Sequence, residues 1–96
     1  MKGKFSRWDA ADHLQSEEDI ALYIDACLDE DPGDGSLLRV ALGDIARARG
    51  MTQVARDSGL SRESLYRALS ADGNPEFSTV WKVMRALRVK LHAHAM

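Results

Sequence analysis

Apolar residues recur at helical spacing along most of the chain, and short polar or glycine-rich stretches divide this pattern into segments. Ser16 is placed to cap the first regular segment. The run Asp31-Pro32-Gly33-Asp34-Gly35 ends it, because proline cannot continue a helix and glycine loosens the chain. Ser36 opens the next segment, and Gly50 is placed to end it. We therefore expect five helices, at 16–30, 36–49, 52–58, 61–70 and 77–87.

The last predicted helix and the tail that follows it differ in period. Phe77, Val80, Trp81, Met84 and Leu87 follow the helical repeat, so we expect Trp81 to pack in the core. Beyond these residues apolar and polar side chains alternate over 89–96, which is typical of a strand with one apolar face. A lone strand is unstable in water, so this one needs a partner, either its own copy in a dimer or the residues near 5–8. The pattern thus predicts an all-α fold of about five helices with a short C-terminal β-strand.

Composition narrows the class of protein. The 96 residues are 45% hydrophobic and 29% charged, which suits one domain with a core and a polar surface. The single cysteine, Cys27, excludes an internal disulfide, and its place on an apolar helix face predicts a buried thiol. No apolar run approaches the ~20 residues that span a bilayer, and the N-terminus does not resemble a secretion signal. We therefore expect a cytoplasmic protein with no membrane partner.

Charge is distributed unevenly along the chain. Residues 1–35 hold three basic and ten acidic side chains, a balance of −7, whereas residues 36–96 hold ten basic and five acidic ones, a balance of +5. The net charge of −2 therefore hides a basic part that can meet phosphates and an acidic part that can meet a basic protein. The alternative is that the acidic helix is simply solvated. We divide the chain into an acidic arm and helix at 1–35, a DNA-binding domain at 36–88 and a tail at 89–96.

Residues 51–70 carry the pattern of two short helices that cross tightly through a turn. Ala55 is small enough for the second helix to pack over the first, and Gly59 tolerates the positive φ that the turn needs. Leu60 and Leu65 can fix both helices to the core, and Ser61 can cap the second helix. This spacing resembles the helix-turn-helix of the Cro/repressor type, and the predicted helices on either side make the resemblance more specific.

In helix-turn-helix units the second helix enters the major groove, and outward side chains near its N-terminus reach base edges. Arginine can hold guanine bidentately, and glutamate can accept from cytosine. The candidate base-contacting residues are therefore Ser61, Arg62, Glu63, Tyr66 and Arg67. The candidate phosphate contacts are Thr52, Gln53, Arg56 and Ser64, with Arg47, Arg49 and Lys82 as weaker ones. The plainer alternative is that Arg62, Glu63 and Arg67 form an ordinary solvated face with local ion pairs.

A closer resemblance covers almost the whole chain. Its most specific motifs are Ala48-Arg49-Gly50-Met51 and Gly73-Asn74-Pro75, and it makes the chain similar to addiction-module antidote proteins, the HigA-like antitoxins of type II toxin–antitoxin pairs. The resemblance implies a homodimer that neutralises a RelE/ParE-type (HigB-like) toxin and represses its own operon by binding double-stranded operator DNA. Such toxins are generally basic, so we expect the acidic segment at 9–34 to attract one. Arg88 departs from the family, which usually has glycine at this junction between helix and strand.

Two alternatives to the antitoxin stay open at this stage. One is a stand-alone transcriptional regulator without a toxin, and the other is an interaction module whose helix-turn-helix has lost DNA binding. A metal site needs three or four converging ligands, and His92 and His94 have only the distant His13 and Cys27 to join them. The sequence also lacks a nucleophile elbow and a glycine-rich phosphate loop. We therefore expect no metal, no cofactor and no catalysis.

Overall fold

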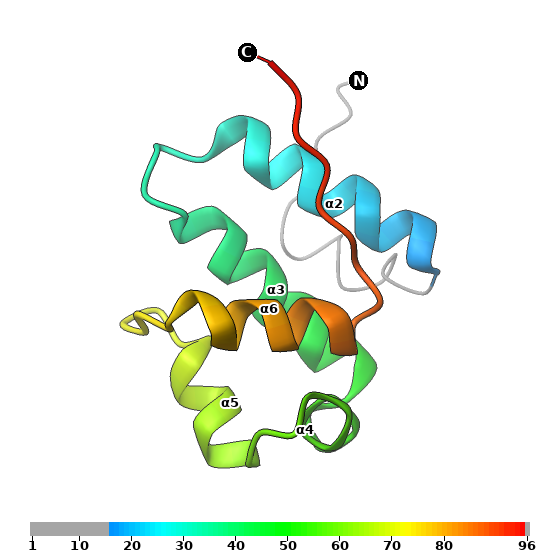
Figure 1. The fold of residues 1–96 in the computed structure, drawn as a ribbon, viewed down its shortest axis with the longest axis vertical. Coiled ribbons are helices and arrows are strands. Elements are labelled where there is room, and N and C mark those ends of the chain that lie inside the picture. The colour runs from blue at the N-terminus through cyan, green and yellow to red at the C-terminus, as the bar shows by residue number, and fades with distance from the viewer. Residues whose placement is uncertain (1–15, 96) are drawn as a thin grey trace.

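Five α-helices make up the regular structure of residues 16–95, the part of the chain that the computed structural model describes (Figure 1). They are α2 (Glu17–Glu30), α3 (Ser36–Arg49), α4 (Met51–Ser58), α5 (Arg62–Ala68) and α6 (Phe77–Ala86). Each lies where the sequence predicted a helix, so the expectation of an all-α domain with about five helices is confirmed for this part. The N-terminal arm that the sequence predicted lies, up to residue 15, outside the described residues.

Local side chains start α2 and α3. The Ser16 hydroxyl accepts a hydrogen bond from the Asp19 amide at 3.0 Å, which is the predicted cap. After α2, the Asp31 carboxylate accepts from the amides of Gly33 at 2.8 Å, Gly35 at 2.9 Å and Leu37 at 2.9 Å. Leu37 lies in the first turn of α3, so this carboxylate joins the end of one helix to the start of the next. The amide of Gly35, then those of Gly33 and Leu37, hold the pKa of Asp31 below its ordinary value of 3.8.

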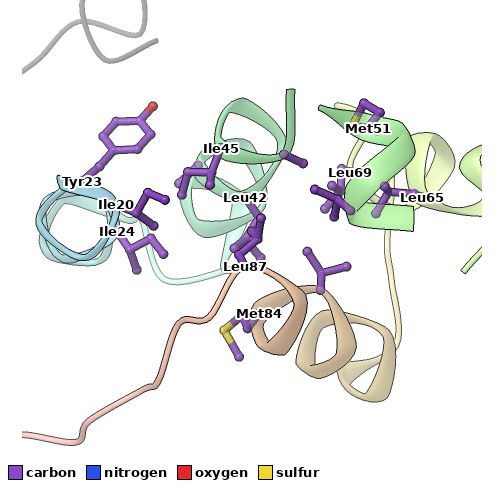
Figure 2. Close-up of a cluster of buried hydrophobic side chains, with 14 of the residues drawn as sticks. Ile20, Tyr23, Ile24, Leu42, Ile45, Met51, Leu65, Leu69, Met84 and Leu87 are labelled. Atoms are coloured by element: carbon purple, nitrogen blue, oxygen red, sulfur yellow. The ribbon is translucent and has the colours of Figure 1, made fainter. Parts of the chain in front are cut away.

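The helices share one hydrophobic core, which Figure 2 shows extending from α2 across α3 and α6 to Met51 of α4 and Leu65 of α5. Burying a side chain of this kind contributes roughly 1.5–3 kcal/mol, so the core is the main source of stability. At its edge, Tyr23 is buried and donates from its hydroxyl to Asp44 Oδ2 at 2.8 Å. Asp44 Oδ1 accepts from Arg47 at 2.8 Å. The largest fully buried side chains are Ile20, Leu42, Ile45, Leu65, Val83, Met84 and Leu87.

Arg88 ends α6 in the left-handed region, with φ 62°. The Val89 amide donates to the Met84 carbonyl at 2.9 Å, and the Arg88 amide donates to the Arg85 carbonyl at 3.1 Å. This pair of bonds is the Schellman motif, in which glycine normally occupies the left-handed position. The junction therefore keeps the backbone geometry of a glycine although it carries an arginine.

The prediction that Trp81 packs in the core is wrong. Trp81 is 45% exposed, and Phe77, one turn earlier, is 69% exposed. The buried side of α6 is centred on Val83 and Leu87, which are almost completely covered. Helical periodicity identified the apolar stripe, but the stripe is wider than the surface that α6 buries against its neighbours.

The predicted C-terminal strand is also not seen: residues 89–95 form no strand, and neither does any other residue of the described part. Val89 packs partly against the core, and the rest of the segment crosses α2 as an irregular chain (Figure 1). A strand needs a second backbone to complete its hydrogen bonds, and the described residues offer this segment none. Of the two predicted pairing partners, the residues near 5–8 lie outside the described part.

Candidate functional site

α4 and α5 are joined by a three-residue turn, and each part of that turn has a local cause. Gly59 adopts the left-handed conformation with φ 80°. The Leu60 amide donates to the Ala55 carbonyl at 3.2 Å, and the Gly59 amide donates to the Arg56 carbonyl at 3.4 Å. Buried Ala55 and Leu65 lie on the inner sides of the two helices. The residues that the sequence singled out for a tight connection are therefore the ones that form it.

Ser61 starts α5 as its N-cap. Its hydroxyl oxygen accepts from the Ser64 amide at 3.0 Å, and the two hydroxyls lie 2.9 Å apart and hydrogen-bonded. Ser61 is exposed and Ser64 is half-buried. Both predicted contact residues thus hold the first turn of α5 in place, and their hydroxyls lie at the helix end where free amides favour an anion.

The outward side of α5 carries the other four candidate base-contacting residues, and all four are exposed. Arg62 donates from Nη2 to the Tyr66 hydroxyl at 3.3 Å. Its guanidinium carbon lies 5.6 Å from the centre of the Tyr66 ring, within the range of a cation–π interaction. Tyr66 therefore restrains Arg62, whereas Glu63 and Arg67 extend from the same short helix.

The exposed side of α4 holds three candidate phosphate contacts. Gln53 donates from Nε2 to Asp57 at 2.9 Å and accepts from Arg56 Nη1 at 3.5 Å. Thr52 is exposed in the first turn of the same helix. The bonds around Gln53 are those that an ordinary solvated face would also make, and exposed pairs of this kind contribute little to stability. The side chains of Thr52, Gln53 and Arg56 are all exposed at the surface of α4.

The structure also assigns a positioning role that sequence reasoning missed. Arg39 on α3 donates from Nε to the Ser70 carbonyl at 3.1 Å and from Nη2 to the Ala71 carbonyl at 3.0 Å. These carbonyls follow α5, where a helix leaves acceptors without intrahelical partners. Gly73 completes this end, because a Cβ there would lie 2.6 Å from the Ala68 carbonyl oxygen. Nothing in the local sequence around Arg39 indicates a partner 31 residues away.

The other residues that the sequence singled out are less accessible to a ligand or do not gather into a site. Arg47, a weaker phosphate candidate, is paired with Asp44 on its own helix. Cys27 is half-buried against the core, and this burial raises the pKa of its thiol above the usual 9.0. Within residues 16–95, no three His, Cys, Asp or Glu side chains gather as a metal site would require. In the same range, none of the helices has the length and apolar character needed to cross a membrane.

Comparison with known proteins assigns the chain to a family. Residues 4–95 match the model of a family described as probable addiction module antidote protein. An uncharacterized protein of Haemophilus influenzae is 54% identical over 90 residues, which cover 94% of this chain and 91% of that protein. No solved structure matches the chain. The match spans nearly every residue described above, and on this basis the chain belongs to the family of probable addiction module antidote proteins.

Proposed function

We propose that this protein is the DNA-binding antitoxin of a type II toxin–antitoxin module, which neutralises a RelE/ParE-type (HigB-like) toxin and represses its own operon. Membership of the antidote family supports a toxin partner in general. The type of toxin and the repression are proposed from the resemblance to HigA-like antitoxins, and the DNA contact is our inference from the residues. The proposal includes no catalytic step and no cofactor, and it places the protein in the cytoplasm.

The observation that carries the DNA-binding part is the outward side of α5. Two short helices joined by a glycine turn present Arg62, Glu63, Tyr66 and Arg67 together, and none of these four side chains is needed by the core. We infer that α5 is the recognition helix of a helix-turn-helix unit. Arg62, held by Tyr66, and Arg67 are suited to guanine, while Glu63 is suited to cytosine. The DNA backbone or nearby bases would be contacted by Thr52, Gln53, Arg56 and the hydroxyls of Ser61 and Ser64.

The distribution of charge supports two partners bound at once. α2 carries six carboxylates and no basic residue. Figure 1 shows it at one end of the longest axis of the molecule, which measures 38 Å, with α4 and α5 at the other end. A basic toxin attracted to α2 would therefore leave the α5 surface free for DNA. We further propose a symmetric dimer whose two recognition helices lie roughly 34 Å apart, one turn of DNA, on a pseudo-palindromic operator.

DNA binding is tested by fluorescence anisotropy with a duplex from the region upstream of the gene, compared with a scrambled duplex. Arg67→Ala should weaken specific binding by about 1–3 kcal/mol, roughly 5- to 150-fold, and should reduce the preference for the upstream sequence. Arg47→Ala is the matched control, because it removes the same charge from an exposed arginine of α3 that is already held in an ion pair with Asp44. Equal losses in the two variants, or no salt-dependent binding of the native protein, would overturn the DNA-binding proposal.

Toxin binding is tested by co-expression with the neighbouring gene product, followed by co-purification and rescue of growth. Deleting residues 1–35 is unsuitable, because this also removes the buried residues Ile20, Tyr23 and Ile24. A double charge reversal, Glu18→Lys with Asp29→Lys, changes only exposed side chains of α2 and should weaken binding. Asp72→Lys in the loop after α5 is the control. Undiminished binding by the α2 variant would exclude this surface, and DNA binding without any protein partner would favour a stand-alone regulator.

A further inference from the structure

Two aromatic side chains lie exposed on α6, outside the core. Phe77 and Trp81 are one turn apart, and their ring centroids are 5.8 Å from each other. Aromatic residues of this size cover ~150–250 Å² each, so the exposed fractions given above leave about 250 Å² of aromatic surface in contact with water. An apolar surface of this area is within what a monomer exposes, so its continuation onto neighbouring residues decides whether it marks an interaction site.

The apolar surface continues from α6 onto the C-terminal segment. Leu91 is 38% exposed and lines a hollow of about 280 Å³ together with Phe77 and other apolar side chains of α6. Trp81 and Val89 line a neighbouring hollow. Phe77, Trp81, Val89 and Leu91 therefore form one surface, which we call the α6 apolar face. In Figure 1 the segment that carries Val89 and Leu91 leaves the end of α6 and passes over α2.

The backbone of the C-terminal segment is available for pairing. Within the described part of the chain, residues 90–95 make no backbone hydrogen bond to another backbone group. Their alternation of apolar and polar side chains is that of a strand. A segment whose amides and carbonyls are unpaired with the rest of the described chain is a template for a strand of another chain. Residues 90–95, which form no strand within one chain, can therefore pair as a strand with a second chain.

Opposite charges flank the α6 apolar face. From residue 81 to residue 90 the chain has four basic side chains and no acidic one, whereas α2 has only acidic ones. Arg85 lines the hollow beside Trp81. Asp25 of α2 lines the hollow on the other side of the C-terminal segment. Glu17 and Arg88 line both hollows and are paired with each other within one chain. In a two-fold dimer, residues on one side of the axis meet residues from the opposite side in the partner, so Arg85 of one copy can face Asp25 of the other.

We propose that the α6 apolar face is the homodimer interface and that a second copy of this chain covers it. A stable interface buries ~800 Å² per partner, of which about 520 Å² is apolar in a homodimer. The aromatic pair alone supplies about half of that apolar area, before Leu91 and the paired backbone are counted. The inference rests on the dimer of the proposed function and names its surface. It leaves Arg62 and Arg67 outside the interface.

The first test is sedimentation velocity of the full chain between ~1 and ~100 µM. The native protein should sediment as a dimer, and Trp81→Glu should raise the dimer dissociation constant at least ~30-fold, as the loss of a central aromatic contact does. Leu22→Glu is the matched control, because Leu22 is an exposed apolar residue of α2 outside the hollows described above. Circular dichroism checks that each variant is folded. A native protein that stays monomeric, or a Trp81→Glu dimer as tight as the native one, would overturn the proposal.

The second test uses the charges. Arg85→Glu and Asp25→Lys should each weaken the dimer, and the two together in one chain should recover part of the loss, because opposite charges then face each other again. A double variant weaker than both single variants would refute the proposed arrangement. These outcomes are separate from the anisotropy experiment with DNA. A chain that dimerises through this face but binds no DNA would remove the proposed function and leave the interface standing.

Discussion

Replacing Arg88 with glycine should make the protein more stable than replacing it with alanine. Arg88 holds φ 62°, a conformation that costs a residue with a Cβ about 1–2 kcal/mol. Glycine avoids that cost but loses more conformational entropy on folding, about 0.5–1 kcal/mol. The difference leaves Arg88→Gly about 0.5–1 kcal/mol more stable than Arg88→Ala.

The comparison with alanine removes the effect of the side chain. Arg88 Nε lies 2.9 Å from Glu17 Oε2, but both side chains are largely exposed, at 73% and 58%. Such an ion pair contributes about 0–1 kcal/mol, and both variants lose it equally. The remaining difference between them is therefore the backbone term at residue 88.

Urea unfolding followed by far-ultraviolet circular dichroism measures this difference. For a chain of this size the free energy of unfolding falls by about 1 kcal/mol per molar urea, so the two midpoints should differ by about 0.5–1 M. All variants are compared at one protein concentration, because association shifts apparent stability. Equal midpoints, or a higher midpoint for Arg88→Ala, would refute the conclusion that residue 88 is strained.

Four further predictions concern the residues that support the fold and the candidate site. Gly59→Ala should lower the free energy of unfolding by about 1–2 kcal/mol through backbone strain alone, since a Cβ there meets nothing within 4 Å. Gly73→Ala should cost more, because its Cβ would collide with the carbonyl oxygens of Arg67 and Ala68; thermal melting that ranks the two the other way would contradict the geometry after α5. Tyr23→Phe should cost about 1.5–3 kcal/mol by removing the bond to the Asp44 carboxylate, and a urea midpoint equal to that of the native protein would disprove that bond. Because the pKa of Asp31 is lowered in the folded state, its stabilising effect is present above its ordinary value of 3.8 and is lost as the pH falls through the lower, folded value. The stability difference between the native protein and Asp31→Ala should therefore shrink in acid, and a difference that does not change with pH would exclude the proposed hydrogen bonds.

The helices and the short connection at 59–61 followed from the sequence because their causes are local. Caps, helix breakers and the spacing of apolar residues act over a few positions. Ser16 and Ser61 cap their helices, and Gly59 adopts the left-handed conformation of the turn, as the sequence predicted. The same locality explains why the exposed side of α5 was predictable. Its four outward residues are those that remain once Leu65 is placed in the core.

Tertiary structure decided the features that depend on distant neighbours. Whether Trp81 is buried depends on how much of α6 the other helices cover, and the helical period of the sequence does not predict that area. Arg39 supports the end of α5 only because folding brings α3 beside it. Arg88 takes a glycine conformation because the bonds that end α6 and the packing of Val89 impose it. Residues 89–95 have the alternating pattern of a strand but form none in the structure, because a strand needs a second backbone beside it.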